Sequence, residues 1–321
     1  MRFMVALALS LTLSVAPAAA QSPVARIGLL GPDEQSRFSD IASGLKQGLR
    51  EQGQPEGSVA ITEVRVARGE NAASARKKIE ALAAQRPAAL FVIGSTLAQQ
   101  ARQVAPTLPI IFITPGDPVQ AGLVASLARP GRNITALTFE YPELSAKRLE
   151  LLRELGPGIR RVLVIYDPRD ASPRQGAAAA RSAARSLGFT LVEVEVQDAG
   201  QIAEALKRLD DADALLGIPG GITSAHYESM ISAANAKRRP SILFTHSPST
   251  RDALLSYGAS DVEVARQAAR AVLKVVRGAD AGDLPVERPA KLTLVINLRT
   301  AKALGITIPP TLLLRVDQVI Q

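Results

Sequence analysis

Few residues in this sequence could carry out acid–base or nucleophilic chemistry. The chain has 321 residues, no cysteine and two histidines, His226 and His246. A nucleophilic hydroxyl at Ser95 or Ser247 would need a neighbouring base, and His246, which follows an apolar run, is the one candidate. The G-x-S-x-G, G-x-G-x-x-G and P-loop patterns are absent. The sequence therefore predicts no enzyme, no bound metal and no cofactor.

Residues suited to ligand binding follow two apolar runs in the first half of the chain. Gly94-Ser95-Thr96 comes after ALFVI, and Asp117 comes after IIFIT and a Thr-Pro-Gly turn. The first suits a plain strand-to-helix turn, and Asp117 before a proline suits the start of a helix over 118–128. Equally, hydroxyl and backbone N–H groups at Ser95 and Thr96 could hold a carboxylate, and Asp117 could hold an ammonium group. Spacing alone leaves both interpretations open.

The second half of the chain places similar residues after its own apolar runs. RVLVIY ends at Tyr166 and leads through Asp167 and a polar turn to Ser172, and later runs are followed by Gly220 and Ser247. In open parallel sheets, ligands bind outside the carboxyl ends of the strands. If the two halves face each other, these residues line one cleft.

Strand and helix patterns alternate along most of the chain and restart near Arg161. Short apolar runs such as RIGLL and ALFVIG are followed by stretches in which apolar residues have helical spacing. The segment IEALAAQRPAALFVIGST corresponds to IAEALKRLDDADALLGIPGG, and LPIIFITPGDP corresponds to RPSILFTHSPS. This repeated order predicts an α/β protein of two similar lobes, each a doubly wound parallel sheet.

Aromatic residues are scarce, and several fall near predicted strand ends and crossovers: Phe38, Phe139, Tyr141, Tyr166 and Tyr257. Tyrosines at sheet ends commonly bridge core and solvent, which explains them without a ligand. Around a cleft they would instead stack on a flat or apolar ligand. An aromatic or branched amino acid fits this set best, with its carboxylate at Ser95 and Thr96 and its ammonium group at Asp117 or Asp167.

Residues 1–20 have the pattern of a secretory signal peptide. Arg2 precedes an apolar run, and Ala18-Ala19-Ala20 suits cleavage before Gln21. The apolar run is too short for a membrane-spanning helix. Because the mature chain has no cysteine for a disulfide or a lipid anchor, we expect an exported, unanchored protein of a Gram-negative periplasm.

The net charge of +8 includes two short basic clusters, Arg76-Lys77-Lys78 and Lys237-Arg238-Arg239, on or beside predicted helices. A nucleic-acid-binding protein would show a basic stripe with interleaved aromatic residues, which this sequence lacks. We therefore expect solvated helix faces and no nucleic-acid partner.

Two segments resemble a known family. PGDPVQAGLVASLARPGRNITALT, which begins at Pro115, is similar to the signature of the ABC-transporter substrate-binding proteins that include tryptophan- and tyrosine-uptake binding proteins. The C-terminal region from LLSYGAS to LLLRVDQVI is similar to the tail of the same family. The resemblance covers essentially the whole mature chain.

The resemblance implies a type I periplasmic binding fold, in which two lobes joined by three crossovers close on a ligand. The implied lobes are residues 21–138 with 257–285, and 139–256 with 286–321. The implied function is that of a monomeric periplasmic receptor that delivers a small molecule, here an amino acid, to an inner-membrane ABC permease. Two alternatives stay open: a ligand sensor that presents its closed form to a signalling partner, and a degenerate hydrolase.

Overall fold

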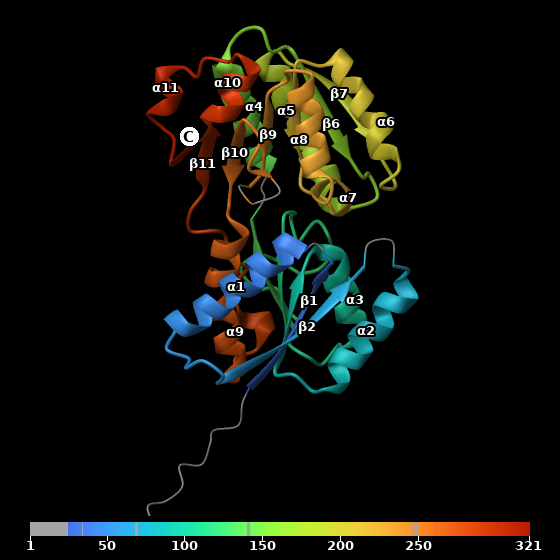
Figure 1. Cartoon of the computed structure of the whole chain (residues 1–321). Helices are drawn as coiled ribbons and strands as arrows, with labels where there is room; N and C mark the ends of the chain where they lie inside the picture. The colour runs from blue at the N-terminus through green and yellow to red at the C-terminus, as the bar shows by residue number, and fades with distance from the viewer. Residues whose placement is uncertain (1–24, 34, 68–69, 140–141, 246, 248–249) are drawn as a thin grey trace, which may run out of the picture.

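The computed structural model describes residues 25–321, apart from residues 34, 68–69, 140–141, 246 and 248–249. They form two α/β lobes, each built on its own sheet, which lie one above the other in Figure 1. The predicted fold class, two doubly wound lobes joined by crossovers, is confirmed. Within the described ranges, no helix is both long enough and apolar enough to cross a membrane. The predicted signal peptide falls outside these ranges.

A five-stranded parallel sheet forms the centre of the first lobe, with its strands in the order β2-β1-β3-β4-β5. The strands are β1 (Ala25–Pro32), β2 (Val59–Val66), β3 (Ala89–Ile93), β4 (Ile110–Thr114) and β5 (Ile134–Thr138). The last three are buried along their whole length. Helices cover both faces of the sheet, which explains why these strands read as continuous apolar runs.

Two pairs of helices cover this sheet. On one face lie α1 (Gln35–Glu51) and α9 (Asp261–Val276), whose apolar residues share a core with Phe91 of β3. On the other face lie α2 (Ala72–Ala84) and α3 (Ser95–Val104). Helix α9 comes from far along the chain and packs beside α1 (Figure 1). The first lobe therefore takes one of its helices from a segment that follows most of the second lobe in the sequence.

A seven-stranded sheet forms the second lobe, in the order β12-β11-β10-β9-β8-β6-β7. The strands are β6 (Arg161–Tyr166), β7 (Thr190–Glu195), β8 (Ala214–Gly217), β9 (Ser241–Leu243), β10 (Leu255–Gly258), β11 (Thr293–Asn297) and β12 (Gln318–Ile320). All neighbours pair in parallel except β10 and β11. That antiparallel pair marks the point where the chain returns from the first lobe.

Helices also cover both faces of the second sheet. They are α4 (Pro142–Leu155), α5 (Ala171–Leu187), α6 (Gln201–Lys207), α7 (Gly221–Ser224), α8 (Tyr227–Ala236), α10 (Leu298–Leu304) and α11 (Pro310–Leu313). Residues of α4 and α5 share one core, while residues of α6 and α8 join the core that continues into the first lobe. Short 3-10 helices follow α6 and α9, at Arg208–Asp211 and Ala281–Asp283.

The chain passes between the lobes after β5, after β10 and after Glu287. Strand β10 pairs within the second sheet up to Gly258, so the expected boundary at residue 257 falls inside a strand. The backbone N–H of Thr138 still donates to the carbonyl of Glu287, and the N–H of Ala290 donates to Gln267 of α9. The third passage therefore lies later in the chain than the expected boundary between residues 285 and 286.

One hydrophobic core continues from the first lobe into the second. Phe139, which follows β5, and Phe244, which follows β9, are almost fully buried, and their rings stack with centroids 6.4 Å apart. The ring of Tyr227 lies 5.7 Å from that of Phe244. Aromatic pairs at such separations stabilise packing beyond their buried area. The two lobes are thus joined by packed side chains as well as by backbone.

The predicted helix over 118–128 is wrong. The Asp117 carboxylate does accept hydrogen bonds from the N–H groups of Val119 and Gln120, as a cap does. The turn that it starts ends at Gly122, whose φ of 68° is left-handed and terminates a helix. The next residue, Leu123, is buried in the first lobe, so the chain is pulled away from a helical path.

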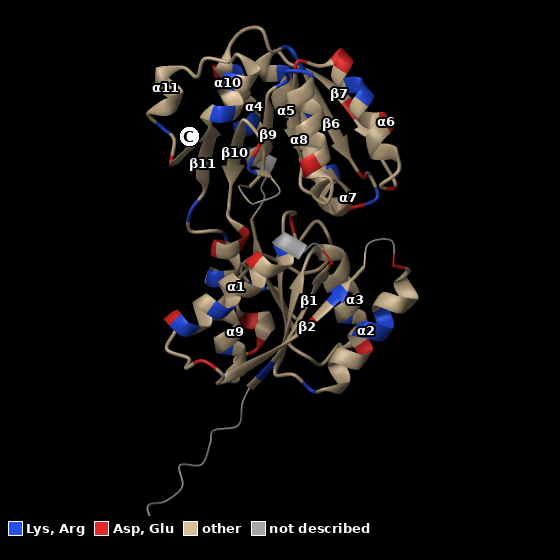
Figure 2. Ribbon diagram, viewed as in Figure 1, with Lys and Arg blue, Asp and Glu red and all other residues tan. Residues whose placement is uncertain are grey.

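Charged side chains of both signs are interspersed over both lobes (Figure 2). In the first predicted basic cluster, Arg76 pairs with Glu80 at 2.9 Å and Lys78 with Glu70 at 2.7 Å. In the second, Lys237 pairs with Asp210. These cations are neutralised locally, as expected for solvated helix faces.

Candidate functional site

A cavity of about 140 Å³ lies between the two lobes, at the carboxyl ends of strands from both sheets. The first lobe contributes Pro32, Arg37, Gly94, Ser95, Thr96 and Pro115. The second lobe contributes Asp170, Ser172, Pro219, Gly220, Gly221 and Ser224. Pockets for drug-sized ligands typically measure roughly 300–1,000 Å³. At this separation of the lobes, the cavity suits a compound smaller than those.

Ser95 and Thr96 begin helix α3 at the wall of this cavity. Gly94 turns the chain from β3 into α3 with a φ of 93°, a conformation that favours glycine. The hydroxyls of Ser95 and Thr114 lie 2.6 Å apart, which fixes the Ser95 side chain against the end of β4. The first backbone N–H groups of a helix have no partner within it, so this end of α3 suits an anionic group.

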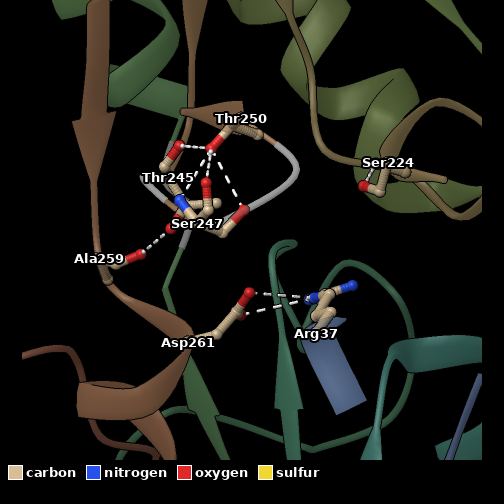
Figure 3. A network of polar contacts seen from close by, with 8 residues as sticks. Arg37, Ser224, Thr245, Ser247, Thr250, Ala259 and Asp261 are labelled. Atoms are coloured by element: carbon tan, nitrogen blue, oxygen red, sulfur yellow. Dashed lines mark hydrogen bonds and ion pairs between the residues drawn. The ribbon is translucent and has the colours of Figure 1, made fainter. Parts of the chain in front are cut away.

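Arg37 supplies a positive charge to the same side of the cavity. Its Nε donates to Asp261 at 3.3 Å, and its guanidinium carbon lies 5.9 Å from the ring centroid of Phe139. Asp261 is buried, and the Arg37 side chain is about one-sixth exposed. In Figure 3 the far end of Arg37 lies on the side of Ser224, which belongs to the opposite lobe. The ion pair holds the guanidinium at the cleft, beside two of the passages between lobes.

Asp170 supplies a negative charge from the second lobe. It is the N-cap of α5, and its Oδ1 accepts a hydrogen bond from the N–H of Ser172 at 3.2 Å. Burial raises the pKa of Asp170, and the neighbouring Asp167 carboxylate adds to the rise, whereas N–H groups of Ser172 and Gly221 oppose it. A buried carboxylate with a raised pKa gains most from a cation placed beside it. The cleft thus holds an arginine on one lobe and a partly desolvated aspartate on the other.

Five of the predicted ligand-binding residues line the cavity: Gly94, Ser95, Thr96, Ser172 and Gly220. The two carboxylates expected to bind an ammonium group have other contacts. Asp117 caps the turn that follows β4. Asp167 accepts two hydrogen bonds from the Arg169 guanidinium, at 2.9 and 2.8 Å. Burial opposes ionisation of Asp167, but the hydrogen bonds from Arg169 outweigh it and lower its pKa.

The predicted aromatic residues that the structure describes do not line the cavity. Phe38 is buried in the first lobe, with the Arg65 guanidinium 4.2 Å from its ring centroid. The Tyr166 hydroxyl donates to Glu195 at 3.0 Å, and Tyr257 packs on the core of the second lobe. None of the aromatic residues in the described part of the chain lines the cavity. Tyr141 and His246 lie outside the described residues.

Ser247 belongs to a turn above the cleft (Figure 3). Its N–H donates to the Thr250 hydroxyl at 2.9 Å, and that hydroxyl donates to the carbonyl of Thr245. The Thr245 hydroxyl in turn donates to the carbonyl of Ala259, next to the second passage between lobes. This network fixes the turn after β9 to the connection between the lobes.

Arg37, Asp170 and Ser224 were missed by the sequence analysis. Each lies a few residues beyond a strand end that the sequence did identify, in the first turn of the next helix or just before it. Candidate residues could therefore have been sought both in the loop after each strand and in the first turn of the helix that follows. Both segments face the cleft at the carboxyl end of a parallel sheet.

The described residues contain no cluster of three or more histidines, cysteines or carboxylates that could hold a metal ion. A larger hollow of about 590 Å³ lies in the second lobe between α8 and α10, and Arg251, Asp252 and Arg299 are part of its rim. It is a surface groove within one lobe. The interlobe cavity is the better candidate because strand ends of both sheets converge on it.

Comparisons with known proteins agree with this geometry. Residues 27–320 match the family described as "ABC transporter substrate binding protein". The chain belongs to this family. Its members are binding proteins rather than enzymes, so the family places the function in ligand binding.

Two solved structures and one curated protein are similar to this member of the family. A conserved domain protein from Vibrio cholerae shares 27% identity, covering 92% of this chain and 99% of that one, with a TM-score of 0.83. A domain from Streptococcus pneumonia in complex with L-Trp shares 24% identity with the same coverages and TM-score. A tyrosine-binding protein of Clostridioides difficile (strain R20291) is 27% identical over 216 residues, 67% of this chain. That match spans 62% of the relative's length.

Proposed function

We propose that this protein is the periplasmic receptor of an ABC importer and captures an amino acid with an aromatic or branched side chain. The lobes close on the ligand by movement at the three passages between them, and the ligand stabilises the closed form. The observation that carries the proposal is the placement of Arg37 and Asp170 on opposite lobes of one cavity. A zwitterion held between them would join the lobes through both of its charged groups.

The charges of the cleft give the ligand one orientation. Its carboxylate binds the Arg37 guanidinium and the start of α3 at Ser95 and Thr96. Its ammonium group binds Asp170, rather than Asp117 or Asp167, because Asp170 lines the cavity and the other two carboxylates do not. Charge-assisted hydrogen bonds of this kind are roughly twice as strong as neutral ones.

The walls of the cavity suit an apolar side chain. Ile93 and Leu97 lie on the side of the first lobe, Pro32 contributes from the end of β1, and Pro115 and Pro219 contribute from two loops. These apolar side chains have no polar group that the ligand would need to satisfy. Burial of an apolar ligand side chain against them would therefore favour binding. The ligands named for the two relatives, tyrosine and L-Trp, support an aromatic amino acid here.

We further propose that the mature protein is a periplasmic monomer, exported by the pattern in residues 1–20. The closed form would dock on an inner-membrane ABC permease and release the amino acid there. The single chain contributes both sides of the cavity, so a monomer suffices for ligand capture.

The test is a thermal-shift screen of residues 21–321 against amino acids, dicarboxylates, amides and purines. A ligand at about a thousand times its dissociation constant adds roughly 4 kcal/mol of stability. We expect a selective rise in Tm with an aromatic or branched L-amino acid, and none with its decarboxylated amine. A response confined to dicarboxylates or purines would contradict the proposal. Hydrolysis of a bound amide would contradict the non-enzymatic role.

A further inference from the structure

The two lobes approach closely where Gly116 meets Ser172. A Cβ atom added to Gly116 would lie 2.2 Å from the Ser172 Oγ and 2.8 Å from its Cβ. Both distances are far below van der Waals contact, which is about 3.5–4.0 Å for carbon atoms. Only a residue without a side chain allows the lobes to come this close.

Both sides of this contact are held rigidly within their own lobes. The N–H of Gly116 donates to the Thr114 hydroxyl at 3.1 Å, and its carbonyl accepts from the Thr138 hydroxyl at 2.8 Å. Ser172 lies in the first turn of α5, where its N–H donates to Asp170. Neither backbone can move aside without breaking these bonds. The contact therefore prevents the two lobes from coming closer together at this point.

A direct hydrogen bond crosses the cleft beside this contact. The N–H of Asp117 donates to the Gln175 Oε1, one turn along α5 from Ser172, at 3.0 Å. It is a backbone group of the first lobe bound to a side chain of the second. Because it forms only when the lobes are at this separation, it favours that separation over a wider one.

The same contact forms an edge of the interlobe cavity. Pro115 and Ser172 both line the cavity, and Gly116 and Gln175 lie directly beside them. The distance at which the lobes meet here therefore sets the width of the space between Arg37 and Asp170. We propose that the Gly116–Ser172 contact is the stop that sets the lobe separation and hence the ligand size, and that Gln175 is a positioning residue that holds the lobes there.

This inference rests on the proposed closing of the lobes, but it can be tested without any ligand. The chain has no cysteine, so a pair of spin labels can be placed by Lys77→Cys on α2 and Ala203→Cys on α6. Both positions are exposed, and these helices lie on the same side of the two lobes (Figure 1). Pulsed electron spin resonance then gives the distribution of distances between the lobes.

We expect Gly116→Ala to shift this distribution to longer distances. Adding Ser172→Gly to the same chain should restore most of the distribution of the parent protein. Gln175→Ala should also shift population to longer distances, while the matched change Gln103→Ala, at an exposed glutamine of α3 away from the contact, should not. If Gly116→Ala does not fold, Gln175→Ala still decides the question. Unchanged distributions in Gly116→Ala and Gln175→Ala would overturn the proposal.

The size of the accepted ligand provides a second measurement. Dissociation constants for L-alanine, L-leucine and L-tryptophan would be compared in the parent chain and in Gly116→Ala. A wider cleft should weaken the smallest bound ligand most, by about tenfold or more relative to L-tryptophan. An equal loss for all bound ligands would contradict the role in size selection. If the parent bound none of them, the proposed function would fail, whereas the label distances would still decide whether the stop exists.

Discussion

At the scale of single residues, the proposed ligand binding depends on two opposite charges, and the surroundings of these charges differ. Arg37 is oriented by an ion pair with the buried Asp261, whereas Asp170 is partly desolvated. An oriented cation can bind a carboxylate without a further loss of side-chain conformational freedom. A desolvated carboxylate attracts an ammonium group strongly. Specific losses of binding should therefore follow from changing either residue.

Arg37→Gln should weaken amino-acid binding by at least about tenfold, because the ligand carboxylate loses a charge-assisted hydrogen bond. It should also lower stability by about 1–3 kcal/mol, since Asp261 loses its partner. Arg65→Gln is the matched control, because Arg65 also contacts a phenylalanine ring and carboxylates but does not line the cavity. Calorimetric titration and urea unfolding would measure both effects. Equal affinity losses in the two variants would contradict the role of Arg37.

Binding should weaken as the solution becomes more acidic. The pKa of Asp170 is raised, so its carboxylate is protonated at a higher pH than an ordinary aspartate, and the neutral form cannot pair with an ammonium group. Conversely, the folded free protein gains stability as the pH falls through this pKa, because protonation relieves the buried charge. Titrations at pH values that fall from neutral toward the usual range of an aspartate would measure the loss of affinity.

The control for this pH dependence is a second aspartate. Burial and the nearby Asp261 also raise the pKa of Asp40, which does not line the cavity. Asp170→Asn should lower affinity and flatten its pH dependence, whereas Asp40→Asn should leave the slope in place. A slope that survives Asp170→Asn would assign the effect to another group.

At the scale of elements, the strand-to-helix turns decide where the binding groups point. Gly94 ends β3 and begins α3 with a φ of 93°, and an added Cβ there would meet nothing within 4 Å. A substitution at this position therefore changes backbone conformation without creating a clash. The direction of Ser95 and of the first N–H groups of α3 depends on that conformation.

Gly94→Ala should cost about 1–3 kcal/mol of stability, because a φ of 93° with a ψ of 151° is a backbone conformation open essentially only to glycine. It should also weaken ligand binding, because relaxing the turn moves Ser95. Gly158→Ala is the control: an added Cβ there also meets nothing, and its φ is not in the left-handed region. It should be neutral or slightly stabilising. Urea unfolding compares them, and equal effects would exclude the conformational explanation.

At the scale of the whole molecule, the core that crosses between the lobes should make them unfold together. Phe139 and Phe244 are buried between elements of both lobes, and α9 brings a distant segment back to α1. We expect a single calorimetric transition for residues 21–321. Phe244→Ala should lower stability by about 3–5 kcal/mol and separate the transition into two. Two transitions in the unchanged protein would show that the lobes unfold independently.

The sequence by itself determined the fold class and part of the cleft. Alternating apolar runs and the duplicated order of segments fixed two doubly wound lobes, because such runs can be buried only between layers of helices. Strand ends such as Gly94-Ser95-Thr96 could be identified in the same way, since the carboxyl ends of parallel strands meet at one edge.

Only the tertiary structure decided which charges face the ligand cavity. Asp117, Asp167 and Asp170 each follow the end of a strand by a few residues, so the sequence does not distinguish them. Their contacts differ because the turn that Asp117 starts ends at Gly122, and because Asp167 pairs with Arg169. The boundary residues between lobes also depend on pairing across the chain, such as that of β10 with β11. Local pattern predicts what a segment can form, but which side chains share one cavity depends on segments far apart in the sequence, as Arg37 and Asp170 do.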